Sequence, residues 1–156
     1  MKGNYSVKRN HRSLKAWQES IVLVEHVYKA TRSFPKDEIF GLVSQMRRSA
    51  VSVPANIAEG SARSGTKELL QFLSIAAASL SELDTHVEIA IRLGYIKDDA
   101  LTREIDDVGG LIMGLIASIK RRMTSPAFIS PFTPSPFALH LEEAPDMHIR
   151  GVHHGN

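Results

Sequence analysis

The stretch QMRRSAVSVPANIAEGSAR, Gln45–Arg63, places a proline within a segment that otherwise has the apolar spacing of a helix. A proline inside a helix removes one hydrogen bond, and its ring clashes with the carbonyl four residues earlier, at a cost of about 3 kcal/mol or more. A helix that retains Pro54 therefore needs it for a kink or for a special packing surface. Two adjacent arginines, Arg47 and Arg48, precede the proline, and small residues surround it. The stretch predicts a helix with a specialised face.

Around this stretch, apolar residues recur at spacings of three and four, which is the pattern of a helix with one buried stripe. We predict a helix from Pro35, which suits the first helical position, to about Glu59, with Gly60 as its stop. Its core stripe consists of Ile39, Val43, Met46, Ala50, Val53 and Ile57.

Three further segments carry the same pattern: 13–32 with Ser13 as N-cap, 66–94 with Thr66 as N-cap, and 97–123. Short connections make consecutive helices antiparallel, and the spacing favours crossing angles of about 20°. The sequence predicts an all-α, up-down-up-down antiparallel four-helix bundle. The three stripes are Leu14, Trp17, Ile21, Val24 and Tyr28; then Leu69, Leu73, Ala76, Leu80, Leu83, Val87 and Ala90; then Leu101, Ile105, Val108, Ile112, Leu115 and Ile119.

The chain divides into a flexible N-terminal arm (1–12), the bundle (13–123) and a Pro-rich tail (124–156). Proline and serine at the density found in the tail leave too little burial to offset the entropy of ordering, so we expect the tail to be disordered. Its Phe128, Phe132 and Phe137 could dock on a partner, and an inert extension is the alternative. A weak His148, His153 and His154 cluster lacks the carboxylate or cysteine support of a metal site.

Bulk composition excludes several classes of protein. A chain of 156 residues suffices for one domain with a real core, and the absence of cysteine excludes disulfides and thiolate metal sites. No apolar run approaches the length of a membrane helix, and the N-terminus lacks the apolar region of a signal peptide. We expect a cytoplasmic protein with no membrane partner.

Charge gathers where the predicted topology brings three segments together: the start of the first helix, the loop before the third and the end of the fourth. A basic end suits nucleic-acid phosphates, because their neutralisation releases counterions. The alternative is that the last cations only complement the negative end of a helix dipole. The basic residues at this end are Lys8, Arg9, Arg12, Lys15, Arg63, Lys67, Lys120, Arg121 and Arg122, and the acidic ones are Glu19, Glu59 and Glu68. The opposite end mixes both signs.

Two features outside the core stripes leave alternatives open. Gly109, Gly110 and Gly114 weaken the fourth helix, which is explained either by tight packing inside the bundle or by a contact between subunits. Arg48 points away from the core stripe, where it could pair with Glu59 or with a neighbouring subunit; two solvated arginines are the alternative.

Catalytic motifs are lacking in the sequence. A di-metal bundle needs Glu-x-x-His repeats, and here leucines stand three residues before His26 and His86. No nucleophile elbow, phosphate loop or dinucleotide fingerprint occurs. We therefore expect no enzyme activity, no catalytic residue, no cofactor and no metal.

The segments FPKDEIFGLVSQMRRSAVSVPANIAEGSAR and LLQFLSIAAASLSELDTHVEIAIRLGYI resemble the four-helix-bundle proteins named after the 23S rRNA intervening-sequence protein. Members of that family are similar to the accessory variability protein of diversity-generating retroelements, a barrel-like homopentamer that binds nucleic acid and engages a reverse transcriptase. The resemblance implies a homopentamer whose small-residue faces are subunit interfaces. The tail and the AAAS run in the third helix depart from the family pattern. The resemblance covers about residues 14–123 and is most specific at the motif and assembly residues Gln45, Arg47, Arg48, Pro54, Asn56, Glu59 and Gly60, with Ile57 and Ala58.

Two functional hypotheses follow. The first is a non-enzymatic homo-oligomeric scaffold, pentameric by resemblance, that binds RNA or DNA non-specifically through Arg12, Lys15, Arg63, Lys67, Lys120, Arg121 and Arg122. The second is an accessory module that binds a protein, for example a reverse transcriptase, and has no direct role with nucleic acid.

Overall fold

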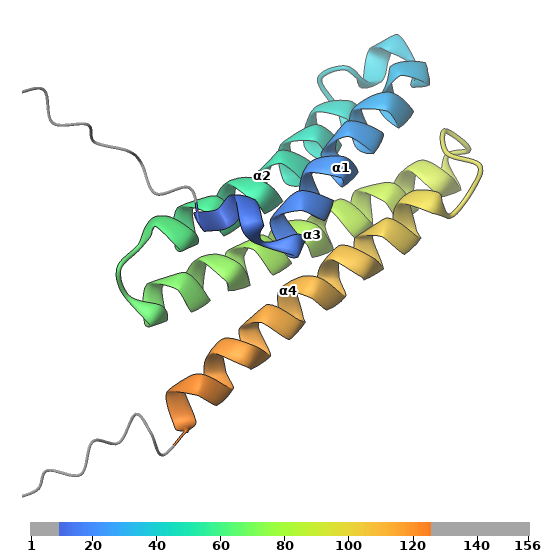
Figure 1. The fold of residues 1–156 in the computed structure, drawn as a ribbon. Coiled ribbons are helices and arrows are strands. Elements are labelled where there is room, and N and C mark those ends of the chain that lie inside the picture. The colour runs from blue at the N-terminus through green and yellow to red at the C-terminus, as the bar shows by residue number, and fades with distance from the viewer. Residues whose placement is uncertain (1–9, 126–156) are drawn as a thin grey trace, which may run out of the picture. The chain divides into compact units, whose positions relative to one another are not determined.

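The computed structural model describes residues 10–125, which are helical almost throughout (Figure 1). Short 3-10 turns η1 (Asn10–Ser13), η2 (Thr31–Ser33) and η3 (Lys36–Glu38) surround α1 (Lys15–Ala30) and lead into α2 (Leu42–Ala62). The chain continues through α3 (Thr66–Arg92) and α4 (Ala100–Thr124). Among the described residues there is no strand, which confirms the all-α prediction. The predictions for residues 1–9 and 126–156 lie outside the described residues.

The four helices form a closed arrangement in which each packs on the next in the chain and α1 also packs on α4. Figure 1 shows consecutive helices running in opposite directions, as the short connections require. The contact between α2 and α3 is the most extensive. The bundle is therefore built around the pair that contains the Gln45–Arg63 stretch.

The core stripes predicted for α2 and α3 are confirmed except at Ile39, which lies in the turn before α2 and is 52% exposed. Val43, Met46, Ala50, Val53 and Ile57 are buried on α2. On α3 the whole predicted stripe is buried except the half-buried Leu69. In α4, Ile116 takes the buried position that we assigned to Leu115.

The stripe predicted for the first helix is wrong by one position. The residues that face the core are Ala16, Ser20, Leu23 and Val27, whereas Tyr28 is 41% exposed. Both sets of residues recur at helical spacing, and the predicted stripe was chosen because its side chains are larger and more apolar than those of the buried stripe. Ser20 is tolerated inside because its hydroxyl donates to the Trp17 carbonyl at 2.7 Å.

Four helix ends also differ from prediction. At the start of α3, Gly65 and not Thr66 holds the N-cap position, and Thr66 is the first helical residue. Ser13 does not cap α1, because its hydroxyl donates to the Asn10 carbonyl within η1. Pro35 does not begin α2; it precedes η3, and α2 begins seven residues later at Leu42, whose N–H donates to Glu38 Oε2 at 3.0 Å. Gly60 does not stop α2, since the helix continues to Ala62.

The end of α3 follows the prediction for Gly94. This glycine has a φ of 74°, a conformation that favours glycine, and its N–H donates to the Ile91 carbonyl. The next N–H, of Tyr95, donates to the Ala90 carbonyl, which completes a Schellman motif and closes the helix.

Candidate functional site

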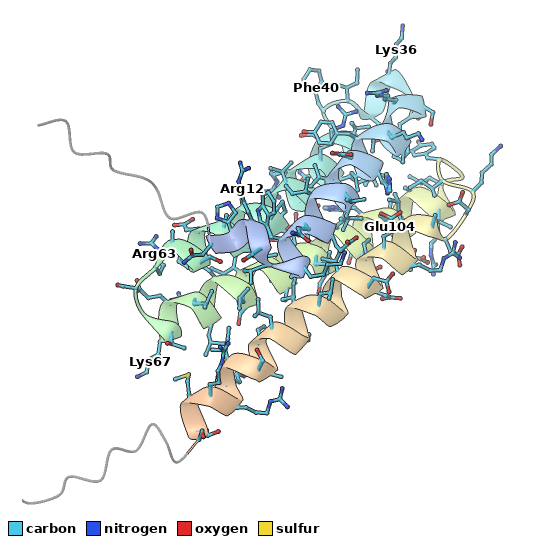
Figure 2. The ribbon with its side chains drawn as sticks, in the orientation of Figure 1. Arg12, Lys36, Phe40, Arg63, Lys67 and Glu104 are labelled. Carbon is cyan, nitrogen blue, oxygen red and sulfur yellow. The ribbon has the colours of Figure 1, made fainter. Side chains whose placement is uncertain are left out.

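The cations predicted to gather at one end are all exposed in the part of the chain that is described. They come from the end of α2, the start of α3 and the last turn of α4, which lie at the same end of the bundle (Figures 1 and 2). The start of α1 is set back from this end, because η1 lies against α2. Arg12 and Lys15 therefore border the basic end along its side.

Two of these cations are paired within the chain. Lys15 Nζ lies 2.5 Å from Glu19, and Arg63 lies 2.6 Å from Glu59, with its guanidinium carbon 5.1 Å from the centre of the Phe72 ring. Both ion pairs are solvent-exposed, so they add little to stability. Within residues 10–125 no ion pair engages the other five basic-end cations, Arg12, Lys67, Lys120, Arg121 and Arg122.

The motif residues of α2 fall into a buried group and a polar group. Pro54 and Gly60 are buried. A methyl group added to Gly60 would lie 2.8 Å from Phe72 Cβ and 3.3 Å from the Leu69 carbonyl oxygen, so the glycine is what allows α3 to approach α2. Both residues therefore serve packing inside the chain.

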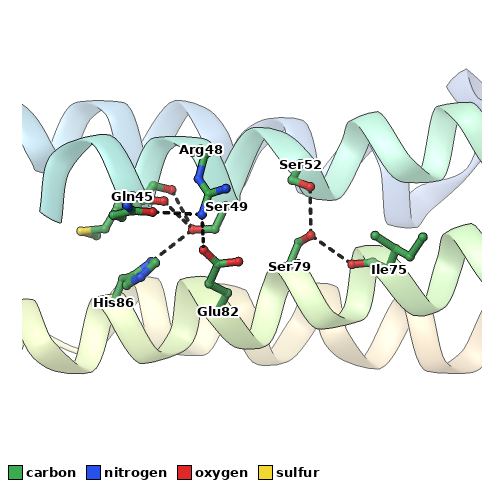
Figure 3. Close-up of polar contacts among 9 residues, drawn as sticks. Gln45, Arg48, Ser49, Ser52, Ile75, Ser79, Glu82 and His86 are labelled. Atoms are coloured by element: carbon green, nitrogen blue, oxygen red, sulfur yellow. Dashed lines mark hydrogen bonds and ion pairs between the residues drawn. The ribbon is translucent and has the colours of Figure 1, made fainter. Parts of the chain in front are cut away.

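The polar group forms a seam between α2 and α3 (Figure 3). Arg48 donates to Gln45 Oε1 at 3.0 Å and to Glu82 at 2.9 Å. One turn further on, Ser52 and Ser79 share a hydrogen bond of 2.9 Å. Glu59 pairs with Arg63 instead, so the intrachain partner that the sequence suggested for Arg48 is not the one it has.

The remaining seam residues are satisfied by local contacts. Asn56 donates to both oxygens of Ser52, at 2.8 and 3.0 Å. The buried Ser49 hydroxyl donates to the Gln45 carbonyl and lies 3.3 Å from His86 Nδ1. Every buried polar side-chain atom of the described residues has a partner, so the seam fixes the register of the two helices at little cost.

Arg47 is half-buried and lies outside the seam. Its Nε donates to the buried Thr31 hydroxyl at 2.9 Å, and its guanidinium carbon lies 4.6 Å from the centre of the Tyr28 ring. The contact joins α2 to the end of α1 across sixteen residues of sequence, which no helical spacing could predict.

Beside Arg47 lies an open groove of about 820 Å³ that the sequence analysis missed. It separates the end of α1 and the following connection from the first half of α2. The exposed aromatic ring of Phe40, 95% accessible, is at its edge. The groove is lined by Tyr28, Thr31, Arg32, Phe34, Pro35, Lys36, Ile39, Phe40, Val43, Ser44, Arg47, Arg48 and Val51.

One titratable group beyond the groove is perturbed. Tyr95 is half-buried, and its hydroxyl donates to Glu38 Oε1 at 3.3 Å. Burial, together with the charge of Glu38, raises the pKa of the Tyr95 phenol above its ordinary value. The same carboxylate accepts the first N–H of α2, so Glu38 joins the α3 end to the α2 start.

Two negative findings concern the described residues alone. Residues 10–125 bring no three histidine, aspartate or glutamate side chains close enough to hold a metal ion. None of their helices combines the length and the apolar character that a bilayer crossing needs.

Comparison with known proteins finds a match to one family model and a similarity of fold to a solved structure. The model of a family described as 23S rRNA-intervening sequence protein matches residues 12–114. A crystal structure of a protein of unknown function from the S23 ribosomal protein family of Bacteroides thetaiotaomicron is similar, with a TM-score of 0.61 and 20% identity. The likeness covers 65% of this chain and 95% of that one. No curated protein matches this chain.

Proposed function

The chain belongs to the 23S rRNA-intervening sequence protein family, and from that premise we propose that it is a non-enzymatic homo-oligomeric scaffold that binds RNA or DNA through its basic end. The observation that carries this proposal is the set of five exposed basic-end cations without an ion pair among residues 10–125. Cations at a surface bind phosphates and read no bases, so the binding is non-specific.

The position of Lys67 separates this proposal from the helix-dipole explanation. Cations at the end of α4 complement the negative end of that helix by about 0.3–1 kcal/mol. Lys67 is the second residue of α3, where the dipole is positive and a cation is unfavourable. Helix stability therefore does not explain Lys67, and a phosphate bound at the basic end would use its charge.

Support for an oligomer comes from the glycines of α4. A methyl group added to Gly110 or Gly114 would have no neighbour within 4 Å, so neither glycine serves packing within the described chain. Each costs its helix about 1 kcal/mol relative to alanine. Met113, 58% exposed, and Ala117 lie on the same face. A second copy packed on this face would use the close approach that glycine allows; five copies are proposed from the resemblance described above.

Salt-dependent binding tests the proposal. In fluorescence anisotropy with a labelled RNA of random sequence, the logarithm of the association constant should fall linearly with the logarithm of the salt concentration. Replacement of Arg63, Lys67, Arg121 and Arg122 by glutamate removes three unpaired cations and Arg63, which is paired with Glu59, so the slope should fall by about 2.1–2.8. An unchanged slope and affinity would show that the basic end is not the binding surface.

The matched control reverses charges at the other end of the bundle. Arg92, Lys97 and Arg103 are exposed, and the first and last of them already pair with Glu88 and Asp99. Their replacement by glutamate should leave the affinity for RNA much closer to that of the unaltered protein. An equal loss in both variants would indicate that net charge, and not the basic end, governs binding.

The alternative function, an accessory module that binds a protein, is favoured by apolar side chains near the end of α3. Ile89 is 42% and Leu93 54% exposed. A pull-down that recovers one protein, and that survives nuclease treatment, would support it. Loss of that protein on nuclease treatment would show that nucleic acid bridges the two proteins, and would favour the nucleic-acid-binding function.

A further inference from the structure

We propose that the groove between α1 and α2 is a second site, which binds single-stranded nucleic acid by stacking a base on Phe40 and holding phosphates with Arg32, Lys36 and Arg47. Figure 2 shows Phe40 and Lys36 at the end of the bundle opposite Arg63 and Lys67. The site is therefore distinct from the basic end and extends the proposed function to a different surface.

The charge of the groove selects an anion. Four of its lining residues are basic and none is acidic. Arg48 is neutralised by Glu82, which leaves Arg32, Lys36 and Arg47 without an ion pair in the region from 10 to 125. The connection carries two carboxylates, Asp37 and Glu38, and neither lines the groove. Glu38 accepts hydrogen bonds from the Leu42 N–H and the Tyr95 hydroxyl.

Arg47 is already held in a binding geometry. Its Nε is bonded to Thr31, whose hydroxyl donates in turn to the Val27 carbonyl at 2.9 Å. Tyr28 supports the plane of its guanidinium. Both terminal nitrogens of Arg47 remain for a phosphate, to which arginine donates two parallel hydrogen bonds. Little side-chain entropy remains to be lost on binding.

Phe40 is kept outside the core by the backbone around it. The turn that holds it is closed by hydrogen bonds from Ile39 N to the Lys36 carbonyl and from Gly41 N to the Glu38 carbonyl. Glu38 also accepts the first N–H of α2, which ties the turn that carries Phe40 to the start of that helix. Its ring is 95% exposed beside three cations, which is the combination that single-strand binding proteins use.

A single strand fits these features better than the other anionic macromolecules. A duplex keeps its bases stacked and paired, so it offers the cations phosphates but offers Phe40 no base. An acidic peptide would satisfy the cations without using a flat, exposed ring. The groove is open to solvent and offers a strand a second planar surface, the guanidinium of Arg47 on Tyr28.

The direct test places a fluorescent reporter in the groove of the full chain. The Phe40→Trp variant should retain stacking, and short oligouridine should quench its added fluorescence. The Val22→Trp variant is the matched control, because Val22 is also an exposed apolar residue (39%) but lies in the middle of α1 and does not line the groove. Equal quenching of the two variants, or none in Phe40→Trp, would overturn the proposal. Because this signal arises at the groove, it persists when the basic end carries the four glutamates, so the two proposals fail separately.

Affinity measurements complete the test. Phe40→Ala should weaken binding of oligouridine by roughly 5-fold to 150-fold, the range that base–aromatic stacking supplies, and should leave duplex binding unchanged. Replacement of Arg32 and Lys36 by alanine should lower the salt slope for the single strand by about 1.4. Displacement of the strand by polyglutamate, or by uridine monophosphate at equal nucleotide concentration, would instead assign the groove to an acidic protein or to a free nucleotide.

Discussion

Gly60→Ala is the substitution whose effect the geometry determines most closely. The added methyl group would lie 2.8 Å from Phe72 Cβ, 3.2 Å from Leu69 Cδ1 and 3.3 Å from the Leu69 carbonyl oxygen. Two of these neighbours are backbone or directly attached to it, so α3 itself would have to move away from α2. Overpacking of this kind costs about 1–3 kcal/mol, against which alanine gains up to about 1 kcal/mol in helix propensity.

The balance of these two effects lowers the free energy of unfolding of Gly60→Ala by about 1 kcal/mol, which lowers the melting temperature by roughly 3–6 °C. Urea unfolding followed by circular dichroism measures the change. The control is Gly109→Ala, because a methyl group there meets only Leu80 Cδ2 at an ordinary 3.5 Å. This control should be stabilised by about 0.5–1 kcal/mol. If both variants gained stability, the close approach of α2 and α3 at Gly60 would be refuted.

Three further outcomes are expected. The pKa of Tyr95 is raised in the folded protein, so its neutral phenol contributes to the free energy of unfolding. This contribution is full below the ordinary tyrosine pKa of about 10 and is lost as the pH rises through the pKa of the folded protein. Urea titrations should show that Tyr95→Phe loses less stability than the unaltered protein on the alkaline side. Leu83→Ala should cost about 2–5 kcal/mol of unfolding free energy, because Leu83 is fully buried; a loss below 1 kcal/mol would contradict its place in the core. A double-mutant cycle between Arg48 and Glu82 should give a coupling of about 0.2–1 kcal/mol, as exposed ion pairs do, and a much larger coupling would mean that the pair is desolvated.

The fold could be predicted where the hydrophobic pattern has one solution. In α2 and α3 the stripes through Met46 and Leu83 are the most continuous runs of apolar residues at helical spacing, and they were identified correctly although α3 also carries Phe72, Ile75 and Ile89 on a second face. In α1 two registers are apolar, and the buried one includes Ser20, whose hydrogen bond to its own backbone is invisible in a pattern of hydrophobicity. Single-helix periodicity cannot decide between such registers, because the choice depends on the neighbouring helices.

The groove could not be predicted because the sequence pattern placed the start of the second helix at Pro35, whereas α2 begins at Leu42. A helix from Pro35 would have put Ile39 in the core and hidden the role of Phe40. In the structure η3 and the turn after it occupy this segment, and Ile39 is 52% exposed. The contact of Arg47 with Thr31 joins two helices, so no local signal pointed to it. The placement of Arg63, Lys67 and the last cations of α4 at one end follows from the order and direction of the helices, whereas the set-back start of α1 depends on the packing of η1 on α2.

Mass measurement by light scattering, with and without nuclease treatment, tests the central claim of an oligomeric nucleic-acid-binding scaffold most directly. We expect the purified protein to carry absorbance typical of nucleic acid, which nuclease removes. The protein that remains should keep a mass about five times the monomer mass of 17.2 kDa. A mass of 17.2 kDa before and after treatment, with no nucleic acid bound, would contradict the account.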